Sequence, residues 1–267
     1  MARIPSHVLV CRCSQARVLS EAVVEDAIDV LKDAGVQVTV VPDLCRLAAT
    51  PGSMPECLTG TEPLGVAACH ERALRSLTEA AGMAHEVREV HYFDLRNASS
   101  PPFEHDELPE DTAAKGHVSE LAEQGDWVPW FPVIDYDRCV SCGQCHSFCL
   151  FGVYATSDDG RVTVTNPQGC KTNCPACARI CPEVAIIFPK LSEAPLNGAA
   201  VDDEAGARAR VQVDVKKILG DDPLAALRKR AEARPKGRIV DRESLLRAMA
   251  ERKACKDRDK RRPERES

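Results

Sequence analysis

The stretch "DRCVSCGQCHSFCLFG", residues 137–152, places four cysteines within eleven positions, spaced C-x2-C-x2-C-x3-C. A second group follows in "GCKTNCPACARICPE", residues 169–183, spaced C-x3-C-x2-C-x3-C with Pro182 directly behind it. Thiolates are soft ligands that suit iron–sulfur clusters, zinc and copper(I). One short loop can supply three ligands to a site but cannot surround it, so a fourth ligand must come from elsewhere in the chain.

Composition and the N-terminal sequence indicate the cellular compartment in which these thiols are expected to lie. The chain has 267 residues, a formal net charge of −6 and 14 cysteines, which does not suggest a nucleic-acid-binding protein. No apolar run approaches the roughly 18 to 20 residues of a membrane span, and the N-terminus lacks the features of a signal peptide. We therefore expect a cytoplasmic protein, and in a reducing compartment dense cysteines indicate metal binding or redox chemistry.

Residues 128–190 resemble the bacterial two-cluster ferredoxin family, in which the fourth cysteine of each run serves the other cluster. The lead-in "VIDYDRCVSCGQC" belongs to the resemblance as well. It implies an α+β domain over residues 127–190 that holds two [4Fe–4S] clusters. One cluster would be held by Cys139, Cys142, Cys145 and Cys181, and the other by Cys149, Cys170, Cys174 and Cys177.

Two departures from the family pattern fall on the second cluster. Leu150 stands where proline is usual, and one extra residue separates Cys170 from Cys174, which makes Cys170 the least secure ligand. Gly143 is expected to allow a tight backbone turn. The apolar residues nearest the cysteines are expected to form a shell around the clusters: Val140, Phe148, Phe151, Val153, Ile180 and Ile187.

Other metal sites compete with the two-cluster interpretation. Eight cysteines are enough for two structural zinc sites of four thiolates each, and a single cluster or a [3Fe–4S] variant is a further alternative. Zinc-binding cysteine pairs are usually separated by a longer span, whereas here three cysteines crowd within seven residues. This crowding favours clusters.

Residues 1–97 read as an α/β domain with a mainly parallel sheet. Short apolar or alternating runs predict strands at 7–11, 36–41, 63–69 and 86–95. Helical periodicity closing on glycine predicts helices at 19–35 and 71–82. Alternation of strands and helices is typical of a parallel sheet covered by helices.

Cysteines follow several of these predicted strands: Cys11, Cys13, Cys45 and Cys69. Because the carboxyl ends of parallel strands meet at one edge of a sheet, these thiols are expected to converge there. Residues 7–97 also resemble the N-terminal domain of the heterodisulfide-reductase-A family in "VLVCRCS", "VPDLC" and "GVAACHERALRSL", without a following flavin domain. That resemblance implies a third [4Fe–4S] cluster on these four cysteines. Inert buried thiols and a redox-active thiol or zinc site are the alternatives.

The rest of the chain is predicted from its composition and turn signals. Residues 98–126 are strongly acidic and read as a linker, with a short helix near 117–124. A hairpin is predicted around "DDG" within 152–166. Residues 191–267 read as a charged, helical and partly disordered tail, with helices at 210–220, 222–233 and 241–254. Cys57 is a weaker ligand candidate, and Cys255 is expected to be a free surface thiol.

These features predict an electron-transfer protein that passes electrons to redox protein partners or within a larger redox complex. One alternative is a component of a heterodisulfide-reductase-like enzyme whose N-terminal cysteines reduce a disulfide or another sulfur species. The other is a structural zinc protein. No nucleophile–base pair, phosphate loop or paired catalytic carboxylates stand out, so no catalytic residue is assigned. The oligomeric state stays open.

Overall fold

The computed structural model describes residues 4–50, 61–83, 89–103, 108, 116–122, 125–206, 209, 246 and 250. The chain divides into two units, Met1–Val211 and Gln212–Ser267, and every element discussed below belongs to the first. The predicted helices at 210–220 and 222–233, together with Cys57 and Cys255, lie outside the described residues. Within 241–254 the two described residues, Leu246 and Ala250, are helical.

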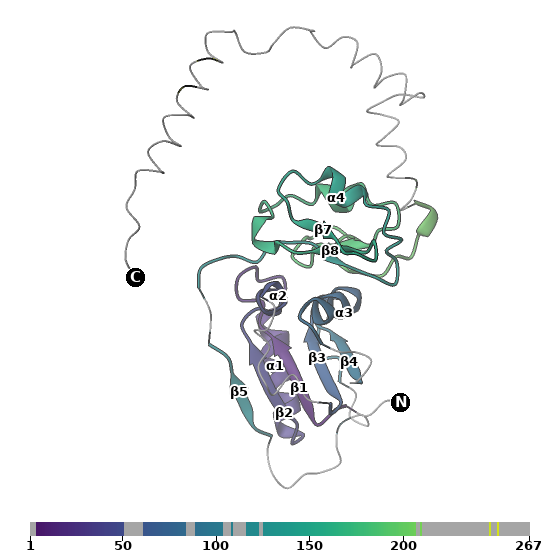
Figure 1. Ribbon diagram of the computed structural model, residues 1–267. Coiled ribbons are helices and arrows are strands. Elements are labelled where there is room, and N and C mark those ends of the chain that lie inside the picture. The colour runs from purple at the N-terminus through teal and green to yellow at the C-terminus, as the bar shows by residue number, and fades with distance from the viewer. Residues whose placement is uncertain are drawn as a thin grey trace. The chain divides into compact units, whose positions relative to one another are not determined.

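A five-stranded parallel sheet forms the N-terminal part, in the order β4-β3-β1-β2-β5 (Figure 1). The strands are β1 (His7–Cys11), β2 (Gln37–Val41), β3 (Leu64–Ala68), β4 (Val90–Asp94) and β5 (Val118–Glu120). All five residues of β3 are buried, as are four residues each of β1 and β2. Near-continuous apolar strands are typical of parallel sheets that are covered on both faces.

Three helices connect these strands: α1 (Glu21–Asp33), α2 (Leu44–Ala49) and α3 (Glu71–Ala80). Helix α1 buries a stripe that includes Val24, Ile28 and Leu31 against the sheet. The four predicted strands and two predicted helices are confirmed. Helix α2 was not predicted; the side chain of Asp43 caps it by accepting a hydrogen bond from the backbone N–H of Cys45 at 3.0 Å.

The predicted short helix near 117–124 is wrong, because Val118–Glu120 form the edge strand β5. The backbone groups on the outer side of β2 need hydrogen-bond partners, and β5 supplies them by pairing with β2 in parallel. The hydroxyls of Thr39 and Ser119 lie 3.2 Å apart across this pair. Pairing with β2 and this polar contact favour the strand, although the local sequence is acidic.

The second part is an α+β arrangement that carries the dense cysteines. Its described elements are β6 (Val133–Ile134), α4 (Gln144–Phe148), β7 (Tyr154–Thr156), β8 (Val162–Val164), the 3₁₀ helix η2 (Pro167–Gly169), α5 (Ala176–Arg179) and β9 (Ile186–Ile187). Strands β6 and β9 pair antiparallel, as do β7 and β8. The predicted hairpin around "DDG" is confirmed by this second pair.

The two parts share a hydrophobic core. Phe131, Val133 and Ile187 of the cysteine-rich part are buried in the same cluster as the residues of the parallel sheet. Trp130 instead stacks on Phe188, with ring centroids 5.4 Å apart, inside the core of its own part. Across the part of the chain that the structure describes, no helix has the length and apolar character needed to span a membrane.

Candidate iron–sulfur site

Three cysteines of the first run and one of the second surround a single narrow cavity. Four thiols line it together: Cys139, Cys142, Cys145 and Cys181. Cys139 and Cys142 come from the loop that leads into α4, Cys145 lies within α4, and Cys181 follows α5, more than thirty residues later. Burial, together with the nearby Cys181, Cys177 and Cys139 thiolates, raises the pKa of Cys145 to about 11. The structure therefore brings together the four residues predicted to share the first cluster.

The second set of thiols consists of Cys170, Cys174 and Cys177 together with Cys149 of the first run. Burial and the neighbouring thiolates of Cys177, Cys174 and Cys149 raise the pKa of Cys170 to about 12. Burial also raises the pKa of Cys177 to about 11, again with contributions from Cys149 and Cys174. Charges act on one another more strongly the closer they lie, so these shifts indicate that the four thiols are neighbours. Cys170, the least secure ligand in the sequence, thus lies beside the other three.

Each set of thiols combines cysteines from both runs of the sequence, and two short helices produce this crossed arrangement. Cys145 lies within α4 and faces the first group, whereas Cys149 caps the end of α4 and lies with the second. Cys177 lies within α5 and belongs to the second group, whereas Cys181 follows α5 and lines the first cavity. One helical turn separates the two members of each pair, so each helix serves both groups.

The backbone around the thiols adopts conformations that are rare elsewhere. Ser141 and Asn173 have φ values of 52° and 61°, and Gly143, at the start of α4, has a φ of 73°. A Cβ at Gly143 would meet no atom within 4 Å, so glycine is favoured there by its φ and not by lack of space. These left-handed residues lie directly beside Cys142 and Cys174 in the chain.

Hydrogen-bond donors reach two of the sulfurs. The hydroxyl of buried Tyr154 donates to the Cys177 sulfur at 3.1 Å. The backbone N–H of Ala185 donates to the Cys181 sulfur at 3.3 Å. Donors of this kind orient metal ligands and tune the metal. Sequence reasoning missed Tyr154, whose only signal was its place in the strand between the two cysteine groups.

The expected apolar shell is only partly present. Val153 and Ile187 are buried, but Val140, Phe148 and Phe151 are 65%, 50% and 43% exposed, so their assignment to the shell is wrong. Leu150, at the position of the usual proline, is 91% exposed. Within the short α4, Phe148 is half exposed while Cys145 is buried. The surface next to the cysteines is therefore apolar.

The N-terminal cysteines converge at the carboxyl edge of the parallel sheet. Cys11, Cys13, Cys45 and Cys69 line one narrow cavity and are only 4% to 7% exposed. Burial is the main cause that raises the pKa of all four thiols, in the case of Cys69 to about 12. From β1 the chain adds β2 on one side of the sheet, and it then crosses over to add β3 on the other side of β1. Ligands of open α/β sheets bind outside such a switch point.

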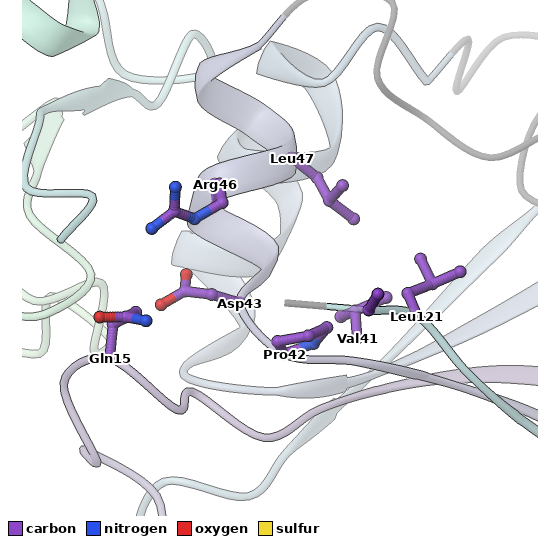
Figure 2. A pocket seen from close by; sticks show the side chains of 8 residues that line it. Gln15, Val41, Pro42, Asp43, Arg46, Leu47 and Leu121 are labelled. Carbon is purple, nitrogen blue, oxygen red and sulfur yellow. The ribbon is translucent and has the colours of Figure 1, made fainter. Parts of the chain in front are cut away.

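Charged residues that the sequence analysis did not single out complete this cavity. Asp43 and Lys190 line it and form a buried ion pair. Figure 2 shows the Asp43 carboxylate at the start of α2, turned away from Leu47 and Leu121. Burial favours the neutral amine, but Cys45 and Asp43 outweigh it and raise the pKa of Lys190 above its ordinary value. Lys190 follows β9, far along the chain, and had no signal in the sequence.

All twelve cysteines among the described residues are free. In the same residues, no three His, Cys, Asp or Glu side chains are arranged to hold a single metal ion.

Comparison with known proteins supports this site. Residues 131–182 match the family described as a 4Fe-4S dicluster domain. Over 63 residues the chain is 49% identical to an uncharacterized ferredoxin of Methanocaldococcus jannaschii. That alignment covers 23% of this chain and 42% of the relative. No solved structure matches the chain.

The cysteine-rich part is thus a ferredoxin-like segment that matches a 4Fe-4S dicluster domain. The family match does not extend over residues 7–97, so their resemblance to the heterodisulfide-reductase-A family stays a prediction.

Proposed function

We propose that this protein transfers electrons through two [4Fe–4S] clusters with crossed ligands. Cys139, Cys142, Cys145 and Cys181 would hold the first cluster, and Cys149, Cys170, Cys174 and Cys177 the second. The observation that carries the proposal is the cavity that Cys139, Cys142 and Cys145 of the first cysteine run line together with Cys181 of the second run. A cubane bound by four thiolates accepts and releases single electrons and leaves no position for a substrate.

The residues around the thiols prepare the site for that role. Buried Val153 and Ile186 limit the access of water, which influences the reduction potential. The donors on Tyr154 and Ala185 hold two sulfurs in place. The exposed Phe148 and Leu150 give a redox partner an apolar surface close to the clusters. We propose that the chain works in the cytoplasm, as a carrier or as part of a larger redox complex.

We further propose a third [4Fe–4S] cluster on Cys11, Cys13, Cys45 and Cys69. Four soft donors line one cavity, and the cationic Lys190 beside them fits the negative charge of a thiolate-ligated cluster. The alternative of direct disulfide or sulfur-species reduction requires a thiol that a substrate can reach. With exposures of 4% to 7%, these thiols fit a buried cofactor better than that chemistry.

Iron and acid-labile sulfide in the anaerobically purified full chain test the proposal. Three clusters give about twelve iron and about twelve sulfide ions per chain, and two give about eight of each. Cys45→Ala with Cys69→Ala is expected to reduce the count from about twelve to about eight. About eight in both proteins would refute the third cluster and leave the ferredoxin function intact. Zinc without iron or sulfide would refute all three clusters. Dithionite reduction followed by transfer to a one-electron acceptor tests the electron-transfer role.

A further inference from the structure

Lys190 belongs to the ferredoxin-like part in sequence, but its side chain lies in the cavity of the α/β part. It follows β9 by three residues and lines the same cavity as Cys11, Cys13, Cys45 and Cys69. Its side chain is only 3% exposed. Removal of an ammonium group from water is costly, so a lysine in this position calls for a reason.

The backbone on both sides of Lys190 is held from the α/β part. Arg96, which follows β4, donates hydrogen bonds to the carbonyl oxygens of Pro189 and Leu191. The backbone N–H of Arg96 in turn donates to Asp94 at 2.8 Å. Because both neighbours of Lys190 are fixed by one guanidinium, its side chain is directed into the cavity and does not lie on the surface.

One carboxylate opposes the ammonium group. Asp43 is paired with Lys190, and its side chain is 2% exposed. The other oxygen of the same carboxylate accepts the hydrogen bond from Cys45 at the start of α2. The cavity therefore has one buried positive charge and one buried negative charge beside its thiols. Each charge comes from a different part of the chain.

We propose that Lys190 is a positioning residue that raises the reduction potential of the N-terminal cluster, and that Asp43 opposes it. This inference rests on the third cluster proposed above. Reduction adds a negative charge to a thiolate-ligated cluster, so a nearby ammonium favours the reduced state and a nearby carboxylate disfavours it. Both effects are strong at a buried site because the local dielectric is low. The ferredoxin-like part thus completes the site in the α/β part.

Redox titration of the full chain, followed by electron paramagnetic resonance, tests this inference. The signal of the N-terminal cluster is identified as the one that disappears in Cys45→Ala with Cys69→Ala. Lys190→Met is expected to lower the midpoint potential of that signal, and Asp43→Asn is expected to raise it. Asparagine still offers an oxygen to cap α2, so this change removes charge and retains the cap.

Two further variants separate charge from structural damage. Lys190→Met with Asp43→Asn removes both charges and is expected to return the potential toward that of the parent. Lys190→Arg keeps the positive charge and is expected to leave the midpoint potential of that signal close to the parent's value. Lys32→Met is the matched control, because Lys32 lies in the last turn of α1, at the opposite edge of the sheet. It is expected to shift no signal.

Opposite shifts with Lys190→Met and Asp43→Asn, together with unchanged potentials of the other two clusters, support the proposal. Shifts in the same direction would indicate loosened packing and overturn it, as would the absence of any shift. Absence of a third signal in the parent chain would also overturn it, while the two-cluster function would stand.

Discussion

Arg72 of helix α3 donates from its Nε to the carboxylate of Asp135 at 2.9 Å. Asp135 begins the turn into the first cysteine loop, because its carbonyl oxygen accepts the backbone N–H of Cys139 at 3.0 Å. The guanidinium also donates to the carbonyl oxygens of Val184 and Ala199, at 2.9 and 2.8 Å. One arginine thus ties the α/β part to the segments before and after the cluster site.

Arg72→Met is expected to destabilise the protein by about 3 to 5 kcal/mol, because it leaves buried Asp135 without its partner. Arg75→Met is the matched control on the same helix: Arg75 pairs with Glu71 at 3.6 Å, and both side chains are more than half exposed. Its loss should cost no more than about 1 kcal/mol. Anaerobic urea unfolding measures both. Equal effects of the two substitutions would contradict the anchoring role of Arg72.

Tyr154→Phe is expected to lower the potential of the second cluster and leave the iron content unchanged. The hydroxyl donates to the Cys177 sulfur, and its loss removes stabilisation of the more negative, reduced state. Tyr136→Phe is the control, because the Tyr136 hydroxyl donates to the carbonyl oxygen of Val162 and not to sulfur. Redox titration of both variants should shift one signal in the first and none in the second. An unchanged potential in Tyr154→Phe would refute this role.

Leu150→Pro restores the residue usual in the family and is expected to change neither iron content nor stability by a measurable amount. Leu150 is 91% exposed, and substitutions at such positions usually stay within about 0.5 kcal/mol. Phe188→Ala, at a side chain that is 1% exposed, should instead cost about 3 to 5 kcal/mol. A rise in iron content with Leu150→Pro would show that the second cluster of the parent chain is incompletely loaded.

Gly116→Ala is expected to weaken the edge strand β5. A Cβ at this position would lie 1.9 Å from the carbonyl oxygen of Val36, and the Gly116 N–H donates to Lys32 at 2.7 Å. Such a clash typically costs about 1 to 3 kcal/mol. Hydrogen exchange should become faster at the N–H of Leu121, which donates to Val40 at 2.9 Å. Ala122→Ser, at an exposed position beyond β5, is the control and should leave this exchange unchanged.

Local patterns were enough to predict most of the fold. Apolar runs in β1 to β3 and the helical stripe of α1 indicated both the elements and their parallel arrangement. Strand β5 was missed because none of its three residues is fully buried and its pairing with β2 is not visible in the local sequence. Helix α2 was missed because six residues are too few to show helical periodicity.

The candidate site also has features that the sequence predicts and features that it does not. Thiol spacing indicated both cysteine groups, since ligand chemistry is recorded directly in the sequence. The insertion of Lys190 beside Asp43, and the contact of Tyr154 with Cys177, depend on packing between distant segments. The outward direction of Phe148 follows from the rotation of a five-residue helix, which residue type alone does not determine.

The crossed ligation of the two clusters is tested most directly by the iron content of two double variants. Cys139→Ala with Cys181→Ala removes two ligands of one cluster, so it is expected to lose about four irons relative to the parent chain. Cys139→Ala with Cys149→Ala removes one ligand from each cluster, so it is expected to lose about eight. The reverse result, about eight irons lost in the first variant and about four in the second, would show that each cysteine run binds its own cluster and would contradict the account.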